Sequence, residues 1–246
     1  MQATERKHGL TLQQKATLAP LLTRLELPSR LRSDVVVWLA RLEPLSLPQL
    51  AAAGLSSDEL ATARRSRDEH RATSRALLRF VLGRALGHPP HRLQFASGTR
   101  GKPFLVTPRS GQHYQFSVSH SQDRGLIALS PTGVTVGVDV EHVSDFDEIE
   151  EVAELLLPAG ARRELRDAAD ATLRLDVFYR HWTRLEAVAK LSGMGLGTIA
   201  QPRDRYVRIT ELTPEPGLVA ALAAAQHAEG AVGRSEGQAA LKNRSR

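Results

Sequence analysis

Two short segments, residues 137–141 and residues 182–190, constrain this chain more than any other feature. The first reads Gly-Val-Asp-Val-Glu, and its alternation of apolar and acidic side chains predicts a strand with one buried face. The second reads Trp-Thr-Arg-Leu-Glu-Ala-Val-Ala-Lys and is expected to form a helix that Gly193 ends. A fold that packs this strand against this helix would gather their acidic and basic side chains in one place.

The strand segment carries two carboxylates on one side. Side chains at positions i and i+2 of a strand project in the same direction, so Asp139 and Glu141 lie together. Val138 and Val140 then face the core. Considered alone, this pattern is more often the solvated acidic face of a half-exposed strand than a functional site.

The helix segment carries a carboxylate and an ammonium on one side. Glu186 and Lys190 are at positions i and i+4, and Trp182 lies one turn before Glu186 on the same face. Alone, the pair is an ordinary helical salt bridge, worth only about 0.2–0.5 kcal/mol. Magnesium is bound by carboxylates together with substrate phosphates and water, so three carboxylates beside a lysine indicate a metal site next to a phosphate site. That combination favours phosphoryl-type transfer.

The composition narrows the chemistry further. The 246 residues include no cysteine, which excludes disulfides, thiolate nucleophiles and cysteine-based metal sites. No apolar stretch approaches the ~18 residues of a membrane span, and we find no apolar signal-peptide core, so we expect a cytoplasmic protein without a membrane partner. The formal net charge of +6 favours an anionic partner, although free use of arginine in a GC-rich genome also explains part of the excess.

Hydrophobic periodicity predicts a mixed α and β chain. Helical spacing predicts helices over residues 11–26, 56–86, 147–157, 159–168 and 174–192. Alternating or β-branched runs predict strands over residues 35–39, 93–108 (strand, turn, strand), 115–119, 126–129, 134–140, 205–212 and 218–224. The last of these is rich enough in alanine to form a helix instead.

This order of elements predicts two lobes, each with a strand, a long helix and antiparallel strands, as in a structural duplication. We expect an N-terminal extension over residues 1–33, an N-terminal lobe over 34–131 and a C-terminal lobe with the metal site over 132–224. The remaining tail, 225–246, contains few large apolar residues and is expected to be disordered.

A third motif is the end of a predicted strand, Phe116 to Ser121. Its hydroxyls and histidine can donate hydrogen bonds to phosphate oxygens, although a turn-capping serine and a surface histidine are common alternatives. Ser119 and His120 are adjacent on an extended chain, so they face opposite sides and are poorly placed as a nucleophile and its base. No Gly-x-Ser-x-Gly elbow is present either, which argues against a serine hydrolase.

Two basic segments complete the set of motifs. Lys102 stands in the turn Arg-Gly-Lys-Pro, and Arg71, Arg75 and Arg79 recur at helical spacing as one cationic stripe. As a solvated helix face the stripe is unremarkable, whereas as a phosphate clamp it would hold an anionic ligand.

In this order along the chain, the motifs at 101–103, 116–121, 137–141 and 182–196 resemble those of the 4′-phosphopantetheinyl transferases. The resemblance is closer to the larger, two-lobed type that activates nonribosomal peptide and polyketide synthases, and it covers roughly residues 34–224. The strand-borne Gly-x-Asp-x-Glu and the helix-borne Trp-x-x-x-Glu-Ala-x-x-Lys are the signature of that family.

The resemblance implies a fold and a set of site residues. The fold is α+β, a pseudo-dimer of two similar α/β lobes with the active site in the cleft between them, and we expect a monomer. By the resemblance, the magnesium ligands are Asp139, Glu141 and Glu186. The residues that bind coenzyme A are then Lys102, Ser119, His120 and Lys190, with Arg71 and Arg75 as further phosphate contacts.

The resemblance also implies the reaction. A serine hydroxyl of an acyl or peptidyl carrier protein attacks the β-phosphate of coenzyme A, the carrier gains the phosphopantetheine arm and 3′,5′-ADP leaves. This is holo-[acyl-carrier-protein] synthase activity, carried out by positioning and charge neutralisation. Glu186 would act as the base, while Lys190 and His120 would offset the growing negative charge.

One position departs from the family pattern. Many relatives have a lysine immediately before the helix glutamate, whereas this chain has Leu185, preceded by Arg184. Adjacent helix positions are about 100° apart around the axis, so Arg184 cannot simply replace that lysine. The departure leaves open a relative that binds coenzyme A or a carrier without turnover.

A different class of protein also has to be weighed. An arginine-rich nucleic-acid-binding protein would explain the charge, but three placed carboxylates would repel phosphate without a metal. Aromatic residues make up only 4% of the chain, whereas single-strand binders usually stack bases on aromatic side chains. We therefore expect coenzyme A and a carrier protein as partners, and no nucleic acid.

Overall fold

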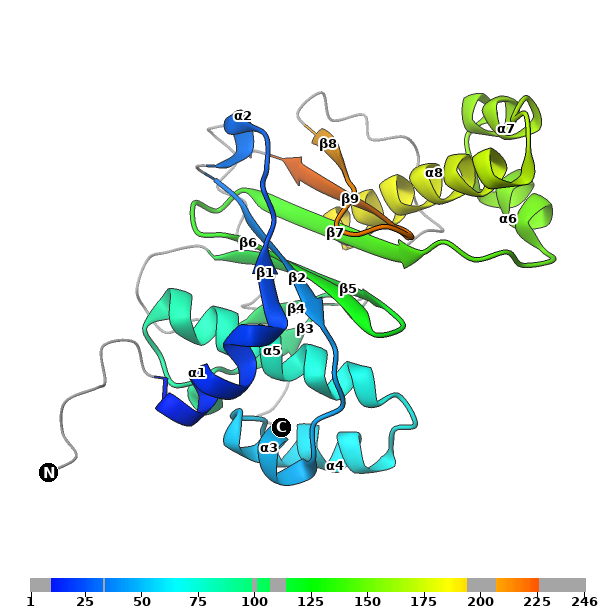
Figure 1. Cartoon of the computed structure of the whole chain (residues 1–246). Helices are drawn as coiled ribbons and strands as arrows, with labels where there is room; N and C mark the ends of the chain where they lie inside the picture. The colour runs from blue at the N-terminus through cyan, green and yellow to red at the C-terminus, as the bar shows by residue number, and fades with distance from the viewer. Residues whose placement is uncertain (1–9, 33, 99–100, 107–113, 194–206, 226–246) are drawn as a thin grey trace, which may run out of the picture.

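The structure, a computed structural model, describes residues 10–32, 34–98, 101–106, 114–193 and 207–225. Within these residues the chain forms three antiparallel sheets with helices around them, so the α+β class predicted from the sequence is confirmed (Figure 1). The tail that we expected to be disordered lies outside the described residues.

The first sheet belongs to the N-terminal half of the chain and has the strand order β1-β2-β6-β5. Its strands are β1 (Leu22–Arg24), β2 (Val36–Arg41), β5 (Gln115–Ser121) and β6 (Arg124–Ser130). A separate hairpin consists of β3 (Phe95–Ser97) and β4 (Pro103–Leu105). The helices of this half are α1 (Leu12–Leu18), α2 (Ser29–Arg32), α3 (Leu47–Ala52), α4 (Ser57–Arg65) and α5 (Glu69–Leu86).

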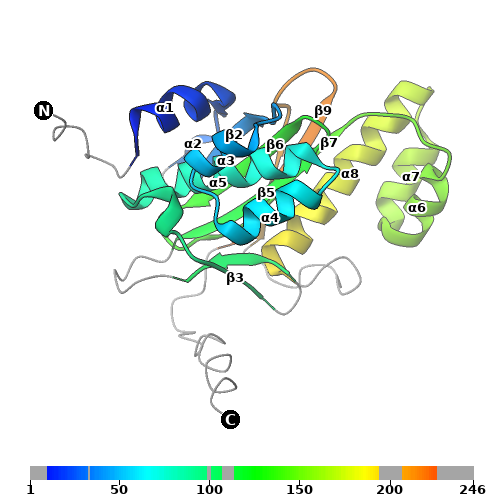
Figure 2. The ribbon, with the colours of Figure 1, turned by 90° about the horizontal axis from the view of Figure 1, so that it is seen from below.

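The second sheet belongs to the C-terminal half and has the order β7-β9-β8. Its strands are β7 (Thr135–His142), β8 (Val207–Leu212) and β9 (Leu218–Ala225), and its helices are α6 (Ile149–Leu156), α7 (Ala159–Arg166) and α8 (Ala171–Ser192). The alanine-rich segment is therefore a strand, and its small side chains Ala221 and Ala223 pack under α8. Figures 1 and 2 both place α6 and α7 at the end of α8 that lies away from α5.

The two sheets are stacked between α5 and α8. On β6, Ile127 and Leu129 belong to the core that packs on α5, whereas Leu126 and Ala128 face the valines of β7. Those valines include Val138 and Val140, which are fully buried, as predicted. Alternation along single strands thus separates the layers, since each strand of the stack presents one face to each neighbour.

The two sheets also meet edge to edge, where serine hydroxyls of β5 join β7. Ser117 Oγ accepts a hydrogen bond from the backbone N–H of Val138 at 3.0 Å, and Ser121 Oγ accepts one from His142 at 3.2 Å. Both partners advance along the chain in the same direction, so β5 and β7 run parallel. This serine ladder consists of residues 117, 119 and 121. Ser117 and Ser121 satisfy edge N–H groups that no strand pairs, whereas Ser119 bonds the side chain of Asp139.

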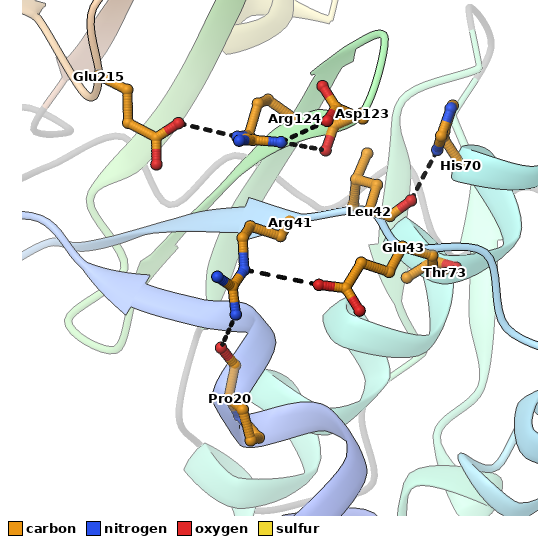
Figure 3. Close-up of polar contacts among 9 residues, drawn as sticks. All are labelled: Pro20, Arg41, Leu42, Glu43, His70, Thr73, Asp123, Arg124 and Glu215. Carbon is orange, nitrogen blue, oxygen red and sulfur yellow. Dashed lines mark hydrogen bonds and ion pairs between the residues drawn. The ribbon is translucent and has the colours of Figure 1, made fainter.

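A second polar link joins the halves at the turn between β5 and β6. Arg124 Nε donates to Glu215 Oε2 at 2.9 Å, and the same guanidinium pairs with Asp123 (Figure 3). Nearby, the end of β2 is tied to α5, because His70 Nδ1 lies 2.6 Å from the carbonyl oxygen of Leu42. The two halves are therefore joined along β5 by serine hydroxyls and at the β5–β6 turn by Arg124.

The predicted helix over residues 56–86 is two helices. The helix start at Ser56 is confirmed, with a capping box in which Ser56 and Glu59 bond each other's backbone N–H groups. The break comes at Ser66, whose hydroxyl accepts from the Asp68 backbone N–H, and Asp68 then caps α5 by accepting from the Arg71 N–H. Side chains that bond nearby backbone groups compete with a continuous helix, and here they end α4 and start α5.

The predicted helix over residues 11–26 is correct only in its first half. Helix α1 ends at Leu18, a single turn of 3-10 helix follows over Ala19–Leu21, and Leu22–Arg24 is a strand. That strand pairs with β2, so tertiary pairing overrides the local helical pattern. The segment set apart as an extension shares the core of the first sheet, because Leu10, Leu18 and Leu21 are buried there.

Candidate active site

Helix α8 lies directly on β7 because residue 137 is glycine. A Cβ added to Gly137 would lie 2.0 Å from the carbonyl oxygen of Ala187 and 2.3 Å from the amide nitrogen of Leu191. No side chain therefore separates the two backbones at this point. Asp139 and Glu141 follow Gly137 on the same face of the strand, so the helix also covers both carboxylates.

Asp139 is the centre of a buried polar cluster. The residue is only 2% exposed, and Oδ1 accepts from Lys190 Nζ at 2.6 Å and from Ser119 Oγ at 2.8 Å. Lys190 also donates to Ser119 Oγ at 2.7 Å. Three of the residues that the sequence proposed for the site, carried by β5, β7 and α8, are thus in direct contact.

The second carboxylate oxygen of Asp139 has no hydrogen-bond partner among the described residues, although it is buried. Burial raises the pKa of Asp139, and the charge of Lys190 opposes that shift. An orphaned anionic oxygen in a buried site is costly unless a donor or a cation completes it. The cluster therefore has one unused acceptor for a cation or a hydrogen-bond donor.

Two further carboxylates, Glu141 and Glu186, lie close enough to Asp139 for its negative charge to raise their pKa values. Burial raises the pKa of Glu141 first, and repulsion from Asp139 raises it further, while Ser121 and Trp182 oppose this as donors. Burial also raises the pKa of Glu186, with repulsion from Asp139 as the next cause. Mutual repulsion of this kind is what a bound cation would relieve.

The donor set fits a hard divalent cation in its chemistry, because it consists of carboxylates without a soft ligand. In the described part of the chain, however, no three histidine, aspartate or glutamate side chains form a ready-made cation cluster. Lys190 instead supplies the positive charge at Asp139. The predicted metal role of Asp139, Glu141 and Glu186 stays a prediction.

Two adjoining pockets open beside this cluster. The smaller, about 270 Å³, is lined by Glu186, Lys190 and Lys102 among others. The larger, about 670 Å³, is lined by side chains of α4, α5, β3 and β5. Both include Gly101, Pro103 and Val118 in their walls, so they are neighbours.

The larger pocket contains three of the predicted phosphate contacts, Arg71, Arg75 and His120. The guanidinium of Arg75 lies 3.9 Å from the ring centroid of Phe95 and 2.5 Å from Glu59. His120 Nε2 lies 3.3 Å from Asp68 Oδ2 on the wall of the same pocket. Ser119 faces Asp139 on the other side of β5, so the predicted opposite orientation of Ser119 and His120 is confirmed.

The predicted cationic stripe is wrong at Arg79. This residue is only 3% exposed, and its side chain donates to Glu59 and to the carbonyl oxygens of Pro90 and Leu93. Arg79 therefore connects α5 to the turn that follows it and does not face the pocket. The spacing of arginines along a helix could not reveal this, because the turn that receives Arg79 comes later in the chain.

Lys102 points at the C-terminal half. Its Nζ donates to the carbonyl oxygens of Leu191 at 3.0 Å and Val136 at 3.2 Å, and burial lowers its pKa from 10.5 to about 8. Its predicted role in binding coenzyme A stays a prediction.

The chain departs from the family pattern at Leu185 and Arg184, and neither residue lines the two pockets. Leu185 packs in an apolar cluster with α6 and α7, and Arg184 pairs with Glu211 at 3.2 Å on the exposed side of the sheet. Trp182 stacks on Phe178 and donates to Glu141.

Sequence reasoning missed two residues of the larger pocket, Glu59 and Phe95. It also missed the serine ladder, which the alternation of serines over residues 117–121 could have indicated.

Comparisons with known proteins identify the family of this chain. A family model for the 4′-phosphopantetheinyl transferase superfamily, ACPS, matches residues 135–232. The 4′-phosphopantetheinyl transferase HetI of Nostoc sp. is 33% identical over 213 residues, which cover 79% of this chain and 89% of that protein. The chain belongs to the 4′-phosphopantetheinyl transferase superfamily. It is accordingly an enzyme of this type, which transfers phosphopantetheine.

Other members of the superfamily match a smaller part of the chain. A putative 4′-phosphopantetheinyl transferase of Synechocystis sp., slr0495, is 34% identical over 164 residues, or 65% of each chain. The L-aminoadipate-semialdehyde dehydrogenase-phosphopantetheinyl transferase of Xenopus laevis is 34% identical over 130 residues, which cover 50% of this chain and 43% of that protein. Among the described residues, no helix has both the length and the apolar character needed to cross a bilayer.

The close approach at Gly137 predicts a sharp sensitivity to one methyl group. Gly137→Ala should destabilise the protein by at least about 1–3 kcal/mol, because backbone atoms of α8 must move to admit the Cβ. Urea denaturation measures this. The matched control is Gly160→Ala in α7, where a Cβ meets nothing within 4 Å and should stabilise by about 0.5–1 kcal/mol. Equal stability of Gly137→Ala and wild type would contradict the backbone contact.

The lowered pKa of Lys102 predicts how stability changes with pH. Between about pH 8 and pH 10.5 the unfolded chain holds more protons at this residue than the folded protein, so its contribution to stability rises with pH. Lys102→Met keeps the stem and cannot titrate. Over that range, wild type should gain on the order of 3 kcal/mol relative to this variant. Denaturation of both proteins across the range measures the gain, and a difference independent of pH would exclude the shift.

Proposed function

We propose that this enzyme transfers 4′-phosphopantetheine from coenzyme A to a serine of an acyl or peptidyl carrier protein of nonribosomal peptide or polyketide synthesis, with magnesium, and releases 3′,5′-ADP. The observation that carries the proposal is the meeting of Asp139, Glu141, Glu186 and Lys190 where α8 crosses β7. Beside that crossing, the linings of the two adjoining pockets include cationic side chains, some of them paired with carboxylates.

The pockets suit the two parts of coenzyme A. The larger pocket would take the nucleotide, with Arg71, Arg75 and His120 on its phosphate, and its volume is within the usual range for ligand sites. The smaller pocket, lined by Lys190 and Glu186, would take the diphosphate. In this arrangement the scissile bond lies next to the buried carboxylates.

Asp139, Glu141 and Glu186 would hold the magnesium ion. When bound, this ion neutralises charge on the diphosphate. Lys190 contacts Asp139 and lines the smaller pocket, so its ammonium can donate to a phosphate oxygen there. Glu186 lines the same pocket, and its raised pKa makes it a better base for the serine hydroxyl of the carrier than an ordinary carboxylate.

We also propose that the two halves are the lobes of a pseudo-dimer that acts as a monomer in the cytoplasm. In support, each half has a sheet covered by one long helix, α5 in the first and α8 in the second. The boundary proposed at residues 131 and 132 falls between β6 and β7, which belong to different sheets.

The alternative is a relative that binds coenzyme A or a carrier without turnover. Leu185 favours it, because this residue packs in an apolar cluster where many relatives have a lysine. Incubation with an apo-carrier, coenzyme A and magnesium, followed by the intact mass of the carrier, tests both. A carrier that gains the mass of one phosphopantetheine supports transfer, and an unchanged mass despite coenzyme A binding supports the alternative.

The carboxylates should be essential for transfer and dispensable for the fold. Asp139→Asn, Glu141→Gln and Glu186→Gln should each lower the transfer rate by more than about 100-fold, because each removes a charge that the reacting groups need. Circular dichroism should remain that of wild type. Glu211→Gln, an exposed change beside α8, is the control and should leave the rate unchanged. Full activity in any of the three variants would remove that residue from the site.

Lys190 should bind coenzyme A as well as balance Asp139. Lys190→Met should weaken coenzyme A affinity by about 1.5–3 kcal/mol in calorimetric titration, the usual scale for a lost charged hydrogen bond. Arg184→Met serves as the control, since it removes a positive charge from the same helix but outside the pockets. If both variants bound coenzyme A as wild type does, its phosphates would have to lie elsewhere.

A further inference from the structure

Lys102 connects the N-terminal hairpin to the two elements that carry the acidic cluster. It stands between β3 and β4, and its Nζ donates to Leu191 in α8 and Val136 in β7. Leu191 is the neighbour of Lys190, and Val136 is the neighbour of Gly137. The ammonium of Lys102 thus donates hydrogen bonds to the backbone of both α8 and β7, which carry the proposed site residues.

These two carbonyls flank the point where α8 and β7 are closest. The backbone of Leu191 is among the atoms that a Cβ on Gly137 would strike, so the ammonium lies at that same crossing. Leu191 is also in the last turn of α8, where carbonyl groups lack partners within the helix. A positive charge there satisfies an orphan carbonyl and complements the negative end of the helix dipole.

The stem of Lys102 contacts the end of the helix as well. Gly193 ends α8 in the left-handed region at φ +68°, and a Cβ there would lie 3.4 Å from Lys102 Cδ. The methylene stem and the ammonium together therefore meet the last turn of α8. Two of the three N–H groups of the ammonium already have backbone acceptors, which leaves little of it for a ligand.

We propose that Lys102 is a positioning residue, which holds the last turn of α8 on β7 and so places Lys190 and Glu186 beside Asp139. The inference rests on the proposed function, and it differs from the sequence-based expectation that the ammonium of Lys102 binds coenzyme A. Gly101 and Pro103 on either side of Lys102 line both pockets. The hairpin that lines the two pockets is therefore the same hairpin that contacts the end of α8.

The burial of this ammonium supports a role beyond stability. Its pKa is lowered by burial and no carboxylate pairs with it among the described residues, so the charge costs free energy in the folded state. A buried charge without a net gain in stability is consistent with a residue that selects one arrangement of its neighbours.

Two variants separate positioning from ligand binding. Lys102→Met keeps the stem and removes the donors, whereas Lys102→Arg keeps a cation that can reach both carbonyls. We expect Lys102→Met to lower kcat at least tenfold while the calorimetric affinity for coenzyme A stays within twofold, and we expect Lys102→Arg to restore most of kcat. A tenfold loss of coenzyme A affinity at unchanged kcat would overturn the proposal and make Lys102 a ligand-binding residue.

A readout without catalysis tests the contact itself. In the full chain without coenzyme A, amide hydrogen exchange over residues 189–193 should be at least tenfold faster in Lys102→Met than in wild type, while exchange over α7 stays unchanged. Equal exchange at the end of α8 in both proteins would overturn the proposal. If wild type failed to modify any carrier, the transferase assignment would fall, and the exchange experiment would still decide whether Lys102 holds the helix.

Discussion

The approach of α8 to β7 at Gly137 is the contact on which the rest of the site depends. Because no side chain separates the backbones there, the helix reaches the strand that carries Asp139 and Glu141, and Lys190 can meet Asp139 at 2.6 Å. A larger residue at position 137 would push α8 away from β7, because its side chain would occupy the space between the two backbones. Close packing of the two backbones is thus what brings Asp139, Glu141 and Lys190 together.

Negative charge exceeds positive charge in this site. Three carboxylates with raised pKa values share one ammonium, and a buried oxygen of Asp139 is left without a donor. A site that is short of positive charge attracts cations and is poorly suited to bind phosphate unaided. Lys190 contacts Asp139, and under the proposed function its ammonium would also donate to a phosphate of the ligand.

Sequence reasoning succeeded where a pattern is local and failed where tertiary contacts decide. Alternation placed Asp139 and Glu141 on one face and Val138 and Val140 on the other. The helix predicted to start at residue 56 does start there, with Ser56 as its N-cap. The strand at Leu22–Arg24 exists because β2 offers a pairing edge, which a helical pattern cannot report.

The site residues divide in the same way. Helical spacing placed Glu186 and Lys190 on one face of α8, and that face does turn toward Asp139. The orientation of Lys102 and the burial of Arg79 depend on acceptors contributed by distant or later segments, so no spacing rule could find them.

The serine ladder between β5 and β7 has a consequence for association between molecules. Each of these strands is the edge of its own sheet, and an open strand edge is a template on which another chain can add. In this enzyme each edge covers the other, through hydroxyl groups that satisfy the free N–H groups without forming a continuous sheet. The contact between β5 and β7 therefore also protects both strand edges against aggregation, and either half on its own would expose its edge.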